Sequence, residues 1–295
     1  MPYPNGGCEL APDEHARPRE RVLHHLDVRE GPTGEGVDAG SQVGVVVDVE
    51  TTGLDMERDE IIQLAIRRFR YDDEGVITHI GQTHEWVEDP GKPIPADITE
   101  LTGLTDADVA WQAIDDNEAT SLLCSASIVI AHHSRFDRRW VERRLEHARG
   151  LPWACSMEQI DWRAQGFDGR GLGYLLCQAG WYHEGHRASA DVDAVIQLLR
   201  HRFQDGRTAL AALLDRSSCP SWLVSAVGAD FEVKDLLRSR GYRWDPRRKV
   251  WWTEVQDADR LAEEIWLARN VYTAAARPKA LGPSFDEITA TTRFL

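Results

Sequence analysis

The sequence contains no paired cysteine motif and no long apolar run. None of its five cysteines forms a C-x-x-C pair, so neither a zinc site nor a redox motif is expected. We predict reduced, mostly buried thiols at Cys8, Cys124, Cys155, Cys177 and Cys219. No stretch approaches the ~18 consecutive apolar residues of a membrane span, and the N-terminus lacks the apolar segment of a signal peptide. We therefore expect a cytoplasmic protein with no membrane partner.

Basic residues are also scarce: 34 lysines and arginines stand against 49 acidic residues, and the formal net charge is -15. This balance argues against binding nucleic acid through a uniformly basic surface. It does not exclude a nuclease, because a site that holds cations must itself be acidic. Any contact with a nucleic-acid backbone must then come from local basic patches.

Length and composition predict two folded units, because 295 residues with 42% hydrophobic side chains can form a large core and a smaller second one. Residues 1–40 are rich in proline, glycine and charge, which predicts a disordered leader. Further shifts in composition place the main domain at 41–205, a linker at 206–220, a small domain at 221–275 and an irregular tail or docking strand at 276–295.

The main domain begins with strand patterns and continues with helical ones. A β-branched run starts at Val43 and ends at the turn Thr51-Thr52-Gly53, and a hairpin of two strands is expected at 61–70 and 76–87. A helical region at 96–126, a strand at 127–131 and helices at 134–148, 172–179 and 189–203 follow. This order predicts an α/β fold with a mixed sheet flanked by helices.

Two carboxylates share one face of the first strand. Side chains alternate along a strand, so Asp48 and Glu50 point the same way while Val47 and Val49 point to the other face. Their mutual repulsion would be relieved by a divalent cation with oxygen ligands, such as Mg²⁺ or Mn²⁺. The alternative is a strand end with solvated acids, and D-x-E alone does not decide between them.

Three more residues could complete such a site. Asp137 follows the apolar run Ile128–Ile130 and lies in the first turn of a helix, as does Asp191. Each could equally compensate the positive end of its helix dipole. His186 precedes Asp191 by five residues, and its imidazole could accept a proton at neutral pH. It is also one of eleven histidines, most of which need no special role.

Taken in order, D-x-E-T-T-G-L-D, H-x-x-x-F-D and H-x-A-x-x-D resemble the motifs of the DEDDh exonuclease superfamily, typified by the proofreading epsilon subunit of bacterial DNA polymerase III. The resemblance covers about residues 42–203, including the segment 95–109 between the first two motifs. It implies an RNase H-like fold and hydrolysis of phosphodiester bonds from a 3′ end, with release of nucleoside 5′-monophosphates.

The resemblance also implies residue roles. Two divalent metal ions, Mg²⁺ or Mn²⁺, would be held by the four carboxylates Asp48, Glu50, Asp137 and Asp191. His186 would be the general base. The terminal nucleotide would contact Thr51, Thr52, Leu54, which would wedge against the last base, and Thr102 of the segment 95–109. One departure concerns the second motif, where many relatives have Asn after the first histidine and this chain has His132-His133.

The small domain is predicted to be α+β, with a strand at 222–227, a helix at 232–240, a hairpin at 242–255 and a helix at 257–270. It holds the most basic segment of the chain, in which cations alternate with aromatic residues. Such a pattern suits single-stranded nucleic acid, although some of the tryptophans must form the domain's own core. We predict a substrate-guiding or partner-binding face at Arg243, Arg247, Arg248 and Lys249.

The leading hypothesis is a 3′-to-5′ exonuclease on single-stranded DNA or unpaired 3′ ends. A 3′-to-5′ exoribonuclease or an oligonucleotide-degrading enzyme is the alternative within the same class, because motifs do not report contacts to the 2′-hydroxyl. A catalytically silent nucleic-acid-binding component is the alternative of another class, since a fold alone does not establish activity. A protein partner could also bind the small domain.

Overall fold

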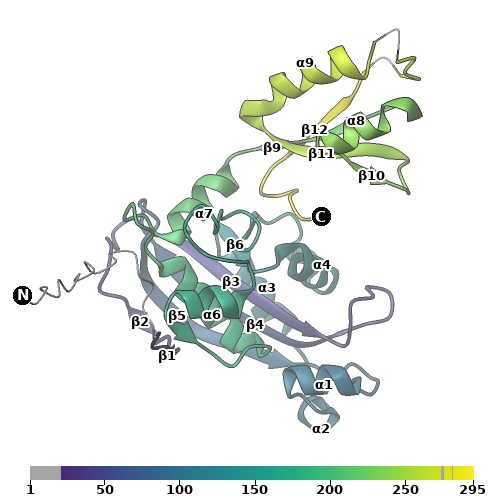
Figure 1. Cartoon of the computed structure of the whole chain (residues 1–295). Helices are drawn as coiled ribbons and strands as arrows, with labels where there is room; N and C mark the ends of the chain where they lie inside the picture. Colours follow the sequence, from purple (N-terminus) through teal and green to yellow (C-terminus); the bar gives the residue numbers. More distant parts are fainter. Residues whose placement is uncertain (1–20, 274–275, 281) are drawn as a thin grey trace, which may run out of the picture.

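The computed structural model describes residues 21–273, 276–280 and 282–295 (Figure 1). A six-stranded sheet in the order β2-β5-β4-β3-β6-β7 forms the larger part. Its strands are β2 (Gly31–Pro32), β3 (Gln42–Thr51), β4 (Ile61–Tyr71), β5 (Ile77–Val87), β6 (Ile128–Ala131) and β7 (Trp153–Cys155). The pairs β3–β4 and β4–β5 are antiparallel, whereas β3–β6 and β6–β7 are parallel, so the predicted mixed sheet is confirmed.

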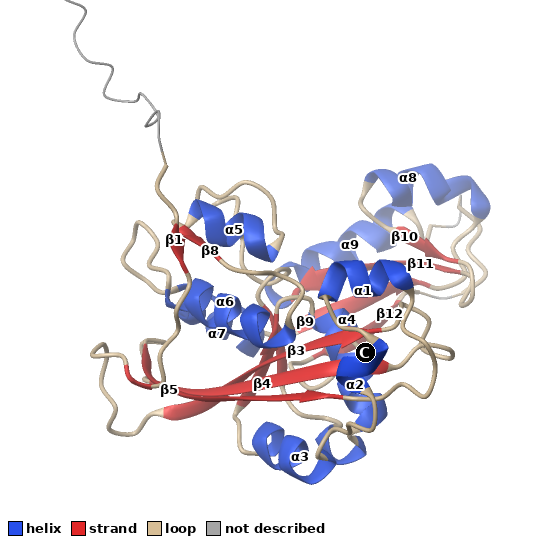
Figure 2. Cartoon of the chain, turned by 90° about the horizontal axis from the view of Figure 1, so that it is seen from below, coloured by secondary structure: helices blue, strands red, loops and turns tan. Residues whose placement is uncertain are grey.

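Helices cover both faces of this sheet, as Figure 2 shows. The bounds are α1 (Ala96–Thr102), α2 (Asp106–Val109), α3 (Asp116–Cys124), α4 (Ser134–Arg144), α5 (Leu172–Gln178), α6 (Ala188–Arg200) and α7 (Ala209–Ser218). Val45, Val47 and Val49 pack in the core that includes residues of α3 and α4, whereas Val46 packs in the core with α5, α6 and α7. The alternation along β3 therefore directs Asp48 and Glu50 toward α6.

A separate antiparallel sheet lies near the C-terminus, with the order β10-β11-β9-β12. Its strands are β9 (Ser221–Ala226), β10 (Arg243–Asp245), β11 (Val250–Gln256) and β12 (Ser284–Ile288), and its helices are α8 (Lys234–Ser239) and α9 (Arg260–Asn270). Val224, Ala226, Leu237 and Leu267 form the centre of its own hydrophobic core. The expected α+β arrangement is confirmed.

Two segments differ from what composition suggested. Of the expected disordered leader, residues 1–20 lie outside the described part, while residues 21–40 include β2 and β1 (His24–His25), which pairs with β8 (Trp181–Tyr182). Leu26 and Val28 are buried there. The expected linker contains α7, whose Leu210 and Leu213 are buried. In both segments a few apolar side chains pack against distant parts of the chain. The local composition does not show such contacts, so it resembles that of a loop.

The last residues return to the six-stranded sheet after β12. The backbone N–H of Trp153 in β7 donates to the carbonyl of Ala290 at 2.8 Å, and Phe294 is buried in the core beneath α4. Arg138 of α4, only 1% exposed, donates to the carbonyls of Thr291 at 2.6 Å and Arg293 at 2.5 Å. The segment 276–295 therefore contains a strand of the small sheet and a docked C-terminal end.

The thiols are less buried than predicted: Cys155 is buried and Cys177 half-buried, but Cys124 and Cys219 are exposed, and Cys8 lies outside the described residues. Cys124 and Cys219 lie at or just beyond helix ends, where solvent reaches the side chain. Among the described residues, no helix has the length and apolar character needed to cross a membrane.

Candidate active site

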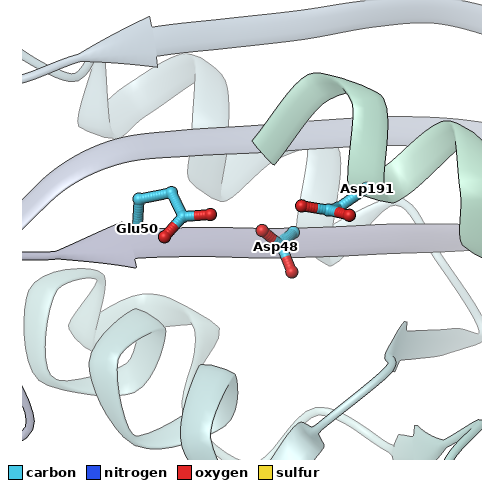
Figure 3. A group of neighbouring side chains, drawn as sticks. All are labelled: Asp48, Glu50 and Asp191. Atoms are coloured by element: carbon cyan, nitrogen blue, oxygen red, sulfur yellow. The ribbon is translucent and has the colours of Figure 1, made fainter. Parts of the chain in front are cut away.

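Three carboxylates meet where β3 approaches the first turn of α6 (Figure 3). Asp48, Glu50 and Asp191 each offer one oxygen, and these oxygens all lie within 4.8 Å of one another. The D-x-E spacing brings the first two to one face of β3, and the helix start brings the third above them. Hard carboxylate oxygens this close together suit a divalent cation such as Mg²⁺ or Mn²⁺.

Asp137 reaches the same cleft from the first turn of α4. It is 2% exposed, and its Oδ1 accepts the backbone N–H of Val49 at 3.3 Å. That contact places it beside the strand residue between Asp48 and Glu50. The structure therefore brings all four predicted carboxylates to one cleft.

The proximity of these acids perturbs their protonation. Burial, and then the charge of Asp191, raise the pKa of Glu50 to about 7. Burial raises the pKa of Asp137 to about 8, although the backbone N–H of Val49 opposes that shift. Burial and the charges of Asp137, Asp191 and Glu50 hold the pKa of Asp48 well above its ordinary value. A cation between the carboxylates would offset this repulsion, so the donor set fits divalent metal ions.

Two histidines flank Asp191. The ring of His186 is exposed and lines the cleft, and its backbone N–H donates to Asp191 Oδ2 at 2.9 Å. Its φ of 64° is a left-handed conformation that few non-glycine residues adopt, and it lets the loop turn sharply into α6. His183 was not predicted. Its Nε2 lies 2.7 Å from Asp191 Oδ1, and its side chain is 7% exposed.

His183 thus holds one oxygen of Asp191 while the loop backbone holds the other. Partners of this kind orient a carboxylate that binds metal. The sequence signal for His183 is the pair of histidines in H-E-G-H before the third motif, but chain order alone does not show which ring turns inward.

The cleft has a volume of about 830 Å³ and both polar and apolar walls. Its lining comprises the four carboxylates, Val49, Leu54, the pair His132 and His133, Phe136, the segment 171–174, Cys177, Tyr182, His183, Gly185 and His186. The cleft can therefore receive a flat apolar group next to the acidic cluster.

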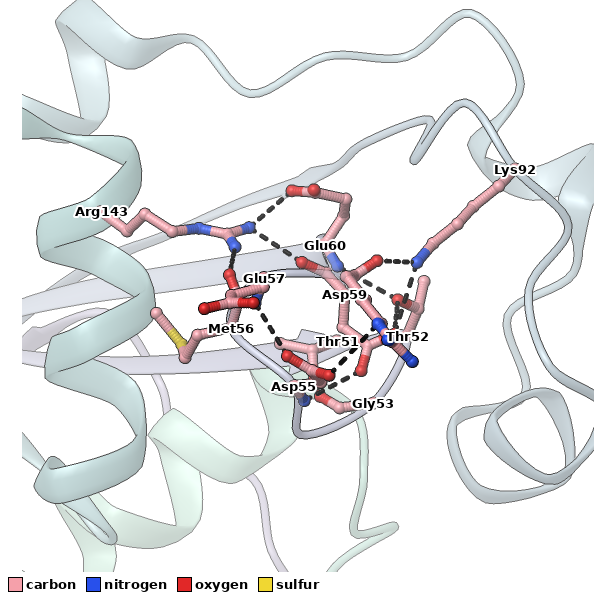
Figure 4. Close-up of polar contacts among 11 residues, drawn as sticks. Thr51, Thr52, Gly53, Asp55, Met56, Glu57, Asp59, Glu60, Lys92 and Arg143 are labelled. Carbon is pink, nitrogen blue, oxygen red and sulfur yellow. Dashed lines mark hydrogen bonds and ion pairs between the residues drawn. The ribbon is translucent and has the colours of Figure 1, made fainter. Parts of the chain in front are cut away.

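Leu54 lines this cleft. It belongs to the loop between Thr51 and Glu60, whose polar contacts are drawn in Figure 4. Leu54 is 83% exposed. Arg143 of α4 donates to the carbonyl of Asp59 at 2.9 Å, and the backbone N–H of Asp55 donates to the Asp59 carboxylate at 2.9 Å. A side chain on Gly53 would displace the Asp59 carboxylate, which accepts the backbone N–H of Asp55.

The predicted threonines use their hydroxyls within the protein. Thr51 donates to the carbonyl of Gly53 at 2.6 Å, and Thr52 donates to Asp59 at 3.0 Å. Thr102 is buried at the end of α1, where its hydroxyl donates to the carbonyl of Ile98 at 2.9 Å. None of the three is part of the cleft lining, whereas Leu54 is. The geometry therefore gives Thr51 and Thr52 a loop-shaping position and separates Thr102 from the cleft.

The unusual His132-His133 pair divides into a buried and an exposed ring. His132 lies between the hydroxyl of Ser156 at 2.9 Å and the carbonyl of Arg170 at 2.8 Å, and burial lowers its pKa to about 4. His133 is exposed in the cleft and stacks on Phe136 with ring centroids 6.2 Å apart. The residue that departs from the family pattern therefore contributes to the wall of the cleft.

The predicted basic residues of the small domain lie outside the cleft. Arg243, Arg247, Arg248 and Lys249 are all exposed, along the β10–β11 hairpin. Two aromatic residues of the basic segment do belong to the domain's core: Tyr242 is buried in it and Trp251 packs against it.

Comparison with known proteins gives a consistent result. The exonuclease (RNase T) family model matches residues 45–199. The chain is 33% identical over 164 residues to the DNA polymerase III PolC-type of Streptococcus suis, covering 52% of this chain and 11% of that protein. With the DNA polymerase III PolC-type of Streptococcus thermophilus, the identity is 34% over 105 residues, covering 35% of this chain and 7% of that protein.

Among solved structures, the fold is similar to E. coli Exonuclease I in complex with a 5cy-dA13 oligonucleotide. The TM-score is 0.50 at 16% sequence identity, and the match covers 85% of this chain and 64% of that chain. The match to the polymerases spans only a small part of their length, whereas the family model spans the six-stranded sheet from β3 to α6.

Proposed function

The chain belongs to the exonuclease family, and we propose that it is a metal-dependent 3′-to-5′ exonuclease that shortens DNA, preferentially single strands or unpaired 3′ ends. One observation carries the proposal: the carboxylates of Asp48, Glu50 and Asp191 converge within 4.8 Å of one another, with Asp137 in the same cleft. Burial and mutual repulsion raise the pKa values of Asp48 and Glu50, as is typical of functional sites. The cluster therefore favours an enzyme over a catalytically silent binding protein.

The four carboxylates would hold two divalent cations, Mg²⁺ or Mn²⁺. Bound there, these ions would neutralise the scissile phosphate and stabilise the attacking and leaving oxygens. His183 would keep the Asp191 carboxylate in place through its Nε2 contact at 2.7 Å. Asp137 would be fixed by the Val49 N–H.

His186 would accept the proton of the attacking water on an imidazole nitrogen. Its ring lines the cleft and is exposed, so both water and substrate can reach it. His183 suits this role less well, because its Nε2 already contacts Asp191. A general base positioned in this way contributes about 10²–10⁴-fold to rate.

The terminal nucleotide would lie across the cleft with its base against Leu54 and Phe136. The loop from Thr51 to Glu60 would keep Leu54 in place, because Arg143 and Asp59 hold that loop from two sides. DNA is the proposed substrate because the solved E. coli Exonuclease I to which the fold is similar holds a dA13 oligonucleotide. The exposed Arg243, Arg247, Arg248 and Lys249 would attract the rest of the strand.

The proposal is tested with matched 30-nucleotide strands labelled at the 5′ end, in Mg²⁺ or Mn²⁺, with products sized over time. We expect a ladder that shortens by single nucleotides, faster for single-stranded DNA than for blunt duplex, and arrested by a phosphorothioate block at the 3′ end. If single-stranded RNA is degraded faster than single-stranded DNA, the preferred substrate is RNA and not DNA. Internal cuts in a 3′-blocked strand would overturn the exonuclease mechanism.

A further inference from the structure

The four-stranded sheet has one covered and one uncovered face. Val224, Ala226 and Trp251 point to the face where α8 and α9 supply core residues, and both helices lie above the sheet in Figure 1. Neighbouring positions on each strand point to the opposite face. Within the described residues, no helix of this domain packs there.

One row of the uncovered face combines cations with an aromatic ring. The strand registers pair Arg243 with Trp252, Trp252 with Ser225, and Ser225 with Ser284. Cζ of Arg243 lies 5.0 Å from the centroid of the Trp252 ring, a cation–π distance. Arg248 reaches back from the turn, and its Nη2 donates to the Ser225 hydroxyl at 3.4 Å. The half-buried Trp252 indole thus lies beside the exposed Arg243, and the exposed Arg248 contacts Ser225, the residue paired with Trp252.

The other rows of this face show where it stays open. The next row carries Glu254, Leu223 and Asp286, and the last row ends at Ser221, whose hydroxyl accepts from Arg293 at 3.0 Å. The docked C-terminal end therefore covers the part of the face nearest the six-stranded sheet. Positive charge and the aromatic ring are confined to the hairpin end, in a protein whose net charge is -15.

We infer that this row, which we call the Trp252 platform (Arg243, Arg248 and Trp252), binds single-stranded nucleic acid upstream of the 3′ end; Ser225 is buried and serves only as a partner of Arg248. A base stacks on the indole and guanidinium planes, and the flanking phosphates contact the two arginines. The acidic row beside it repels phosphate and so keeps the strand at the hairpin end. Binding of a single strand at the platform does not depend on the proposed function; the statement that this strand is the enzyme's substrate does.

The opposite side of the same hairpin supplies a matched control. Trp244 pairs with Trp251 in the register, with ring centroids 5.6 Å apart, and it points to the helix-covered side. It is 48% exposed, so it offers an accessible indole of the same kind on the wrong face. If nucleic acid bound to any exposed tryptophan, both Trp244 and Trp252 would contribute to binding. Binding at the platform predicts that only Trp252 contributes.

The test uses the full chain carrying Asp48→Asn, so that strands are not degraded, and measures the anisotropy of fluorescein-labelled dT30. We expect Trp252→Ala to weaken binding about tenfold, the loss of one stacked base. Trp244→Ala should stay within about twofold. Arg243→Gln should reduce the slope of log affinity against log salt by about 0.7, one phosphate contact on a single strand. Equal effects of the two tryptophan changes, or none, would overturn the platform.

Two measurements separate misfolding and failed catalysis from this result. Trp252→Tyr keeps an aromatic ring and should restore most of the affinity. If Trp252→Ala weakened binding only by disturbing the fold, its melting temperature would also fall. Hydrolysis of the p-nitrophenyl ester of thymidine 5′-monophosphate requires only the cleft. If the wild type binds dT30 but does not hydrolyse the ester, the proposed function is refuted and the platform is not. If the wild type hydrolyses the ester but does not bind dT30, the platform is refuted and the proposed function is not.

Discussion

Competition between protons and metal ions at the acidic cluster gives a quantitative prediction. Burial and Asp191 raise the pKa of Glu50 from 4.5 to about 7, so in the metal-free protein this carboxyl keeps its proton at pH 6 and releases it by pH 8. A cation must displace that proton to bind. With a pKa of about 7, the penalty on apparent affinity is about 11-fold at pH 6 and about 1.1-fold at pH 8. Asp137, whose pKa is raised to about 8, also holds a proton in this range, so metal binding should strengthen by at least about tenfold, or about 1.4 kcal/mol, between these pH values.

The same shift sets the sign of the stability change without metal. The folded site keeps a proton that the unfolded chain has lost, so metal-free protein loses stability as the pH rises from about 4.5 through about 7. Added Mn²⁺ should restore that stability, and by more at pH 8 than at pH 6. Asp137, whose pKa is raised to about 8, acts in the same direction and extends the effect to higher pH.

Calorimetric titration with Mn²⁺ at pH 6 and pH 8 checks this prediction, with melting temperatures measured alongside. Glu50→Gln should weaken binding at pH 8 and flatten its pH dependence. Glu184→Gln is the matched control, because Glu184 is an exposed acid on the loop beside the cleft that is not part of its lining. An affinity that is the same at both pH values in the wild type, or a control that behaves like Glu50→Gln, would show that protonation of Glu50 does not limit metal binding.

The other predictions concern residues around the cluster. His186→Ala should lower kcat by about 10²–10⁴-fold at pH 7.5 with little change in Mn²⁺ affinity, whereas His183→Ala should weaken Mn²⁺ binding by about 10–100-fold; steady-state kinetics and titration separate the two. Arg138→Met removes a buried partner of Glu142, 2.8 Å away, and the contacts to the C-terminal end, so urea unfolding should show a loss of about 3–5 kcal/mol. The neighbouring Arg139 is exposed, so Arg139→Met should lower the free energy of unfolding by less than about 0.5 kcal/mol. An equal loss in Arg138→Met and Arg139→Met would show that the buried contacts of Arg138 do not stabilise the fold.

The sequence predicted the main sheet because its strands are long and β-branched, and their patterns match the cores on both faces. Strand β4, for example, lies at 61–71 where 61–70 was expected. Short elements were missed: β7 has three residues and β1 and β8 have two each, too few for a pattern. Helix α7 was assigned to a linker because its end, Arg216-Ser217-Ser218, has the composition of a loop.

The candidate site was predictable to the extent that chain order fixes it. The motifs specify which carboxylates converge, because they lie on a strand and on helix starts whose positions the fold determines. They do not specify side-chain contacts, so His183 was missed and Thr102 was placed with the substrate although it is buried in α1. The faces of the small sheet also depend on strand register, which decides that Trp252 and Trp251 point in opposite directions.

Metal-dependent hydrolysis by the wild type and by Asp48→Asn on the same 5′-labelled DNA strand tests the proposed mechanism most directly. With Mg²⁺ or Mn²⁺ the wild type should shorten the strand from its 3′ end; a chelator should stop the reaction, and added metal should restore it. Asp48→Asn should be slower by at least about 10³-fold while it keeps its fold, because it removes one ligand of the cluster. Degradation that persists in chelator, or that is equally fast in Asp48→Asn, would show that the carboxylate cluster does not catalyse the reaction through bound metal ions.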